Sequence, residues 1–219
     1  MSFAAGISSI IFDMDGVLWQ SSDIHAAAYR AVLDQAGLEM PDYQSIAGRR
    51  TSDVMRELLM AQRPSKSSED LEAITVLTKA KQDAARQLLR SRPPLTPDCA
   101  AVVRELARSK RLALASSASA KTIALFLDCS GIRGCFDAVV SGDGVSISKP
   151  HPAIYQLALQ KLGCAGAEAA VVEDAPAGVR AALDAGIASV IAIEGTVTRE
   201  RLVEAGAHRV IANLRELVA

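Results

Sequence analysis

The sequence predicts an α/β protein built on a doubly wound, mostly parallel sheet, with an inserted helical unit. Short apolar runs bounded by turn residues recur along the chain, and segments with helical periodicity separate most of them. Continuous apolar runs favour strands that are buried on both faces, as in a parallel sheet. Their alternation with helices is typical of the doubly wound class.

Each element of this fold is predicted by a local pattern. The strands are expected at Ile7–Phe12, Leu112–Ala115, Ala138–Val140, Ala169–Val172 and Ala188–Ile193. Helices of the sheet domain are expected near Asp98–Arg108 and at Ser119–Leu127, Pro152–Leu162 and Pro176–Ala185. Two of these helices open with proline, which the first turn tolerates because its N–H groups need no intrahelical acceptor.

The segment from Trp19 to Arg92 breaks the alternation, because it shows helical pattern and no good strand. Prolines 93, 94 and 97 end it. We therefore expect residues 1–18 and 93–219 to form an α/β core domain and residues 19–92 to form a helical cap domain. Two connections between them make a plausible hinge.

Composition narrows the class of protein. Half of the 219 residues are hydrophobic, which is ample for a core. The net charge of -1 gives no basic face, so we expect no nucleic-acid partner. No apolar stretch approaches the roughly 20 residues that a membrane span requires, and no signal-peptide pattern is present, so we expect no membrane partner. The four cysteines form no CxxC pair, which favours reduced thiols in a cytoplasmic protein. Oligomeric state is not predicted.

The first predicted strand ends in Asp13-Met14-Asp15-Gly16. Residues two apart on a strand point the same way, so both carboxylates can face one cavity, although a turn at Asp15 could redirect the second. Two like charges this close require a cation or a proton, which indicates a metal site or an acid/base pair. The alternative is a solvated turn, since Asp and Gly are ordinary turn residues.

Three further strand ends carry polar residues. Ser116 and Ser117 follow the second strand at a helix start, where hydroxyl and N–H groups can cradle a phosphate or simply cap the helix. Lys149 precedes Pro150 and can pair with phosphate or with Asp13, or lie in solvent. Glu173 and Asp174 offer the hard oxygen ligands that Mg²⁺ prefers, or complement a helix dipole. Their joint occurrence on successive strand ends favours one phosphate and metal site.

These residues resemble the four motifs of the haloacid dehalogenase superfamily, in order and spacing. The helical insert after the first motif looks like the type-one cap of the branch that contains phosphoglycolate phosphatases and β-phosphoglucomutase. The resemblance implies that Asp13 is the nucleophile and Asp15 the general acid and base. It also implies that Ser116 and Lys149 hold the phosphoryl oxygens. Mg²⁺ would be bound by Asp13, the Asp15 carbonyl and Asp174, with Glu173 nearby and acting through water.

In the cap, the resemblance to β-phosphoglucomutase places His25 near Asp15 and Lys81 near a lysine that binds a second phosphate. Gly48 and Arg49 fall in the segment that resembles the cap's substrate-specificity loop. With Ser117 they complete the predicted substrate-binding set. The alternatives are ordinary packing for the histidine and solvation for the arginine.

The resulting hypothesis is a Mg²⁺-dependent phosphatase for a small phosphorylated metabolite, such as a sugar phosphate or phosphoglycolate. An acid at position 15 argues against dehalogenation, because a halide leaving group needs no proton. The alternative is a sugar phosphomutase, but the cap arginine of that enzyme would align with Thr51, which weakens this reading. A third hypothesis is a catalytically inactive binding or regulatory protein with the same fold. It is disfavoured because every motif residue is present.

Overall fold

The computed structural model describes residues 3–62 and 68–219 and contains a six-stranded sheet of order β3-β2-β1-β4-β5-β6. All neighbouring strands pair in parallel, which confirms the predicted fold class. The strands are β1 (Ser9–Phe12), β2 (Arg111–Ser116), β3 (Ala138–Ser141), β4 (Ala169–Glu173), β5 (Ser189–Ile193) and β6 (Arg209–Ile211). The edge strand β6 was not predicted, because it is only three residues long, begins with arginine and buries only its last residue fully.

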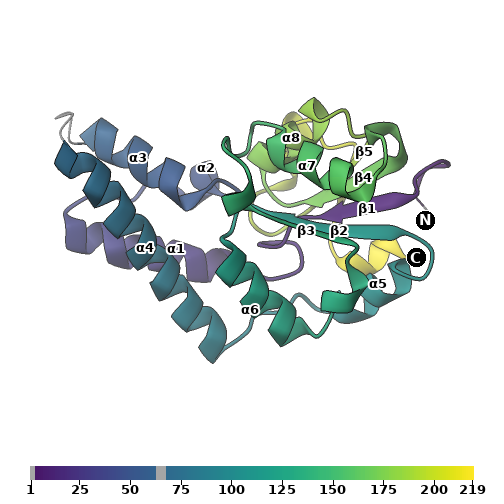
Figure 1. Ribbon diagram of the computed structural model, residues 1–219, viewed down its shortest axis with the longest axis horizontal. Helices are drawn as coiled ribbons and strands as arrows, with labels where there is room; N and C mark the ends of the chain where they lie inside the picture. The colour runs from purple at the N-terminus through teal and green to yellow at the C-terminus, as the bar shows by residue number, and fades with distance from the viewer. Residues whose placement is uncertain (1–2, 63–67) are drawn as a thin grey trace.

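Helices cover both faces of the sheet (Figure 1). Alternate residues of β1 point to opposite faces: Ile10 and Phe12 join one buried cluster and Ile11 joins the other. This two-sided burial explains why the predicted strands are continuous apolar runs. The first cluster packs against α5 (Cys99–Leu106) and α6 (Ala120–Ser130), and the second against α7 (Ala153–Leu162), α8 (Pro176–Asp184) and α9 (Arg199–Glu204). Short 3₁₀ helices occur at Arg133–Cys135, Gly142–Gly144, Gly166–Glu168 and Leu214–Leu217.

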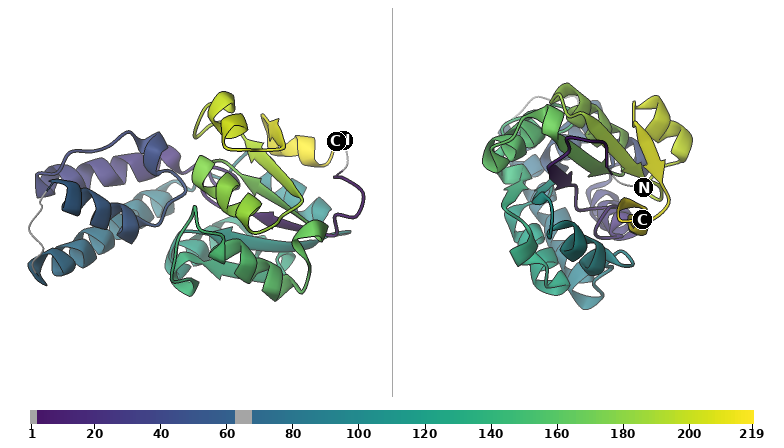
Figure 2. Two further views of the ribbon diagram at one scale, coloured as in Figure 1. Left: turned by 90° about the horizontal axis from the view of Figure 1, so that it is seen from above. Right: turned by 90° about the vertical axis from the view of Figure 1, so that its right-hand side faces the viewer.

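The inserted segment is helical, as the sequence predicts. It contains α1 (Ser22–Ala36), α2 (Tyr43–Ile46), α3 (Thr51–Gln62) and α4 (Ser68–Ser91). These helices pack around a buried cluster of their own, which includes Leu33, Met55 and Leu59. They lie beyond the carboxyl ends of the strands (Figures 1 and 2).

The two connections between sheet and insert run side by side. Gln20 N donates to the Pro94 carbonyl at 2.7 Å, and Thr96 N donates to the Leu18 carbonyl at 3.1 Å. Between them, the Trp19 side chain is fully buried against Phe126. Paired connections of this kind fit a hinge. The domain boundaries at residues 18/19 and 92/93 stay a prediction, and residues 1–2 and 63–67 of the predicted core and cap lie outside the described residues.

Among the helices in the described ranges, none is both long and apolar enough to cross a bilayer. The predicted cytoplasmic location stays a prediction.

Candidate active site

Asp13 and Lys149 form a buried ion pair at the carboxyl edge of the sheet. Asp13 directly follows β1, whose neighbours are β2 and β4, and its backbone N–H donates to the Val172 carbonyl of β4 at 2.9 Å. Lys149 Nζ lies 2.6 Å from Asp13 Oδ1. Burial raises the pKa of Asp13 to about 8; Lys149 opposes this shift, while the charges of Glu173 and Asp15 add to it. The carboxylate therefore needs positive charge nearby to stay ionised at neutral pH.

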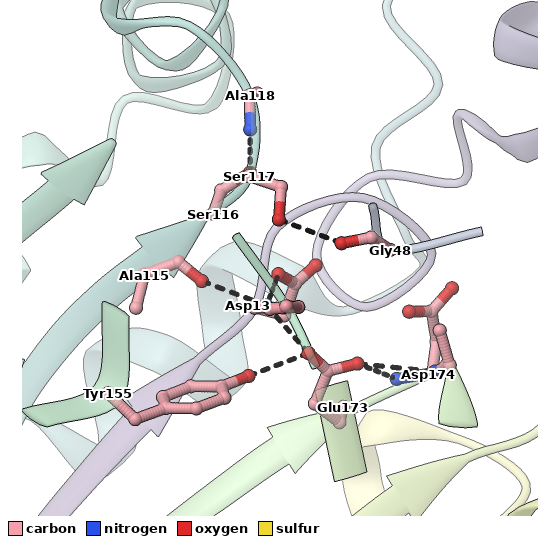
Figure 3. A network of polar contacts seen from close by, with 11 residues as sticks. Asp13, Gly48, Ala115, Ser116, Ser117, Ala118, Tyr155, Glu173 and Asp174 are labelled. Atoms are coloured by element: carbon pink, nitrogen blue, oxygen red, sulfur yellow. Dashed lines mark hydrogen bonds and ion pairs between the residues drawn. The ribbon is translucent and has the colours of Figure 1, made fainter. Parts of the chain in front are cut away.

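Glu173 holds Lys149 from the other side. Its Oε1 accepts a hydrogen bond from Lys149 Nζ at 2.7 Å. The same oxygen accepts one from the Tyr155 hydroxyl at 2.6 Å (Figure 3). Its Oε2 accepts from the backbone N–H groups of Asp174 and Ala175, at 2.9 and 3.2 Å. Both oxygens are thus engaged by the protein. Burial would raise the pKa of Glu173, but Lys149 and these hydrogen bonds outweigh it and lower the pKa, so Glu173 is an anion.

Asp174 is a third buried carboxylate, next to Glu173 in the chain. Its side chain is 3% exposed, and its Oδ1 is buried without a hydrogen-bond partner. Burial, followed by the charges of Glu173 and Asp13, raises its pKa well above the usual range. Gly16 lies against it: a Cβ on Gly16 would meet Asp174 Oδ2 at 1.7 Å, and the φ of Gly16 is +79°. Only glycine fits at position 16, because any side chain there would collide with the Asp174 carboxylate.

The Asp15 carboxylate is held by residues of the insert. Ser21 Oγ donates to Asp15 Oδ1 at 2.5 Å, and His25 Nε2 lies 3.0 Å from the same oxygen. The other ring nitrogen of His25, Nδ1, lies 3.0 Å from Lys81 Nζ. Because an ammonium can only donate, Nδ1 must accept and Nε2 must carry the proton that is donated to Asp15.

The electrostatics agree with this chain of contacts. Burial, followed by the charge of Lys81, lowers the pKa of His25, so the ring is neutral at pH 7. Burial lowers the pKa of Lys81 to about 8, and the amine lies 4.2 Å from the centre of the Tyr29 ring. Burial would raise the pKa of Asp15, but His25, Ser21 and Lys81 together lower it. Asp15 is therefore ionised at neutral pH when nothing is bound.

A cleft of about 470 Å³, partly open to solvent, lies between the strand ends and the insert. Most of the predicted site residues line it, namely Asp13, Asp15, His25, Gly48, Arg49, Lys81, Ser116 and Ser117, together with Tyr29, Tyr43, Ile46, Thr51 and Ala118. Ser116 Oγ accepts from Ala118 N at 3.1 Å, and Ser117 Oγ donates to the Gly48 carbonyl at 2.7 Å (Figure 3). Arg49 pairs with Glu57 at 2.5 Å. Lys149, Glu173 and Asp174 lie buried beside Asp13.

Comparison with known families decides the identity of the fold and site. A model of the haloacid dehalogenase-like hydrolase family matches residues 7–186. The chain belongs to this family. The match spans all four motifs and the insert, so the resemblance predicted from the sequence is confirmed, and the chain is an enzyme of the hydrolase class.

Relatives within the haloacid dehalogenase-like family include named phosphatases. The phosphorylated carbohydrates phosphatase of Thermotoga maritima is 30% identical over 206 residues, covering 92% of this chain and 92% of the relative. The fructose-1-phosphate phosphatase YqaB of Escherichia coli is 30% identical, covering 84% of this chain and 95% of the relative. A solved structure of a CbbY mutant from Rhodobacter sphaeroides in complex with xylulose-(1,5)bisphosphate is 27% identical, with a TM-score of 0.80 over 96% of both chains.

The buried charges of this family member fit a bound divalent cation. Asp13, Glu173 and Asp174 are buried carboxylates, while Lys149 is the buried cation among them, and Asp174 Oδ1 has no partner. Within residues 3–62 and 68–219, no three side chains of His, Cys, Asp or Glu converge as a complete metal site. Mg²⁺ does not need one, because it is usually held by one or two carboxylates together with water and substrate phosphate.

Several contacts of the site were not predicted. Tyr155 supports Glu173 and lies under Lys149, whose Nζ is 4.8 Å from the ring centre. Ser21 supports Asp15. No sequence signal identifies Tyr155, because its partner is 18 residues away on another element. Ser21 stands six residues after Asp15, where a hydroxyl next to the first motif could have been noticed.

Proposed function

We propose that this enzyme is a Mg²⁺-dependent phosphatase that hydrolyses a small sugar phosphate through an aspartyl-phosphate on Asp13. One observation carries the proposal: the nucleophile candidate Asp13 lies against Lys149, while Asp15 is held separately by Ser21 and His25. Two carboxylates in different surroundings can take different roles in one reaction.

In the first half-reaction, Asp13 attacks the substrate phosphorus, and the bond from phosphorus to the sugar oxygen breaks. Lys149 and Ser116 bind the phosphoryl oxygens and stabilise the charge that spreads over them. Asp15, protonated as substrate binds, gives its proton to the leaving sugar oxygen. The products of this half-reaction are the free sugar and a phosphorylated Asp13.

In the second half-reaction, a water molecule attacks the phosphorus of phosphorylated Asp13. Asp15 accepts a proton from that water, and the bond between phosphorus and the Asp13 oxygen breaks. Inorganic phosphate leaves and the Asp13 carboxylate is restored. The Ser21 and His25 hydrogen bonds hold Asp15 at one position for both proton transfers.

For Mg²⁺ we propose the Asp13 carboxylate, the Asp15 backbone carbonyl and Asp174 as ligands. The cation would supply charge stabilisation for the phosphoryl group and would neutralise the buried carboxylates. Glu173 was predicted as a nearby metal residue acting through water. Because both of its oxygens already accept hydrogen bonds, we assign it to holding Lys149 and the backbone of residues 174 and 175.

The relatives support a sugar phosphate as the substrate class, since two of them are named as phosphatases of phosphorylated carbohydrates and of fructose 1-phosphate. Water is the proposed final acceptor. A mutase must hold a second phosphate, yet Thr51 stands at the position of the mutase arginine and Arg49 is paired with Glu57.

Release of phosphate from a panel of sugar phosphates, phosphoglycolate and p-nitrophenyl phosphate, with Mg²⁺ and with EDTA, tests the proposal. The wild type should release phosphate with Mg²⁺ only, and Asp13→Asn should release none. Incubation with β-glucose 1-phosphate and its bisphosphate tests the mutase alternative. Glucose 6-phosphate forming faster than free phosphate would favour that alternative.

A further inference from the structure

Arg50 and Asp53 of the insert contact the loop that leads to Lys149. The Arg50 guanidinium donates to the Val145 carbonyl at 2.7 Å and to the Ser146 carbonyl at 3.3 Å. Ser148 Oγ donates to Asp53 Oδ2 at 2.5 Å. Two side chains at or just before the start of α3 therefore contact three residues of one core loop, at positions 145, 146 and 148. Arg50 and Asp53 also face each other, with Arg50 Nε 4.0 Å from Asp53 Oδ2.

This loop is irregular and partly exposed. Residues 145–148, all of them described by the structure, belong to no helix or strand. Val145 packs against the second core cluster at the start of the segment, whereas Ile147 near its end is 52% exposed and adds little packing. The next residue is Lys149, whose amine must stay within reach of both Asp13 and Glu173. A shift of the loop backbone would be carried directly to that amine.

The Arg50 contacts exist only when the insert lies against the core. Arg50 is 18% exposed, and its hydrogen-bond acceptors in the loop lie 95 and 96 residues away in sequence. Movement of the insert about the paired connections would separate donor and acceptor. Hydrogen bonds from a charged group are among the stronger ones, and the planar guanidinium can serve two carbonyls together.

We propose that Arg50 and Asp53 are positioning residues that place Lys149 for phosphoryl transfer when the cap packs against the core. This inference rests on the proposed function, because it assigns Lys149 to the phosphoryl group. Closure of the cap would then do more than exclude water from the cleft, because it would also hold the Lys149 amine in position beside Asp13 and Glu173. No local pattern predicts this role, because the acceptors of Arg50 lie 95 and 96 residues away in the chain.

Another contact between insert and core provides a matched control. Arg201 of α9 donates to Gln44 Oε1 of α2 at 2.8 Å, and among the described residues neither side chain forms a hydrogen bond with residues 145–148. If closure alone matters, loss of either arginine should have similar effects. If the loop contact matters, only Arg50 should affect the chemical step.

The test measures kcat and KM for p-nitrophenyl phosphate and fructose 1-phosphate with Mg²⁺ in the wild type, Asp13→Asn, Arg50→Ala, Arg50→Lys and Arg201→Ala. We expect Arg50→Ala to lower kcat by about 10- to 100-fold, the range for a small misplacement of a catalytic group. KM should change less than about threefold, Arg50→Lys should recover part of kcat, and Arg201→Ala should stay within about threefold of wild type. Equal losses of kcat in Arg50→Ala and Arg201→Ala would overturn the proposal.

A double-mutant cycle separates a shared loop contact from two independent ones. Arg50→Ala combined with Asp53→Ala should lose little more kcat than Arg50→Ala alone, whereas Arg50→Ala combined with Arg201→Ala should show additive losses. Additive losses in the first pair would overturn the proposal. If Arg50→Ala does not fold by circular dichroism, Ser148→Ala decides instead: kcat should fall about 3- to 10-fold, and an unchanged kcat would overturn the idea.

Failure of the proposed function is distinguishable from failure of this inference. A wild type that releases no phosphate from either substrate, or an Asp13→Asn variant that retains full activity, contradicts the phosphatase itself. An active wild type in which Arg50→Ala behaves like Arg201→Ala contradicts only the coupling between cap and Lys149.

Discussion

The core and the cap contribute to the active site by different physical means. The core groups lie at the ends of neighbouring parallel strands, and Lys149 ties them together: its amine contacts Asp13 at 2.6 Å and Glu173 at 2.7 Å while its side chain is fully buried. The cap groups reach the site from helices. His25 and Lys81 contact Asp15 in a chain, and Arg49 pairs with the exposed Glu57.

This difference assigns different work to the two regions. Backbone pairing with neighbouring strands fixes Asp13 and Glu173, so these groups are in place whatever the substrate, whereas Lys149 follows a loop that the insert contacts. The cap groups depend on helix packing and on the position of the insert, and His25, Arg49 and Lys81 line the cleft from the side of the insert. We therefore expect substitutions in the core to abolish or strongly lower kcat. Substitutions in the cap should instead change the pH dependence of kcat and the affinity for substrate.

The largest effect is expected from Lys149→Met, which keeps the length of the side chain and removes its charge. Loss of one group that stabilises transition-state charge costs about 10²- to 10³-fold in kcat. The unpaired carboxylates of Asp13 and Glu173 should also lower the free energy of unfolding, by about 3 kcal/mol for a broken buried pair. Phosphate release and urea unfolding measure the two effects, with Lys161→Met on the exposed side of α7 as control. A variant with a tenth or more of wild-type kcat would contradict the role of Lys149.

Asp174→Asn should come next, because it replaces the buried carboxylate whose Oδ1 has no partner. A ligand at 100 times its dissociation constant stabilises a protein by about 2.7 kcal/mol, so Mg²⁺ should raise the melting temperature of the wild type. The variant should lose that rise and most of its activity, roughly 100-fold. Differential scanning fluorimetry with Mg²⁺ and with EDTA gives the readout, and the exposed Asp184→Asn is the control. Undiminished stabilisation of Asp174→Asn by Mg²⁺ would place the cation elsewhere.

The residues that line the cleft were largely predicted from the sequence, in the core and the cap alike, whereas the contacts that position them were not. Short apolar runs located the strands, and because the carboxyl ends of parallel strands meet at one edge, the groups after them were expected to converge. Asp13 and Lys149 do so from 136 residues apart. Nothing in local periodicity pairs Tyr155 with Glu173 or Arg50 with the loop before Lys149, since those contacts depend on tertiary packing.

A smaller, pH-dependent effect is expected in the cap from His25→Ala. Burial alone would raise the pKa of Asp15, but its neighbours, His25 foremost, lower this pKa, so loss of the imidazole in His25→Ala should raise it. Asp15 must be ionised to accept a proton from water, and the acid limb of kcat against pH should therefore move to higher pH. We expect the loss of kcat to be largest at acid pH and to shrink as the pH rises.

His25→Gln, which can still donate a hydrogen bond to Asp15, should shift the acid limb less than His25→Ala. The exposed His151→Ala should not shift it. Identical pH profiles for wild type and His25→Ala would show that the cap does not control Asp15. If His25→Ala lowered kcat as much as Lys149→Met does, the cap would be as important for the chemical step as the core, contrary to the comparison above.

The smallest effect is expected from Glu57→Gln, at the outer end of the Arg49 pair. The Glu57 side chain is 63% exposed, and exposed ion pairs contribute at most about 1 kcal/mol, so the melting temperature should not change. Arg49 lines the cleft, and without Glu57 its charge is free to attract a phosphorylated substrate. KM should fall by about two- to threefold at low salt, with kcat unchanged, and the difference should disappear at high salt because exposed charges are screened. Glu72→Gln on α4 should leave KM as in the wild type. A change in kcat rather than in KM would mean that Arg49 acts on the reacting phosphoryl group, and the cap would then share in the chemistry that we assign to the core.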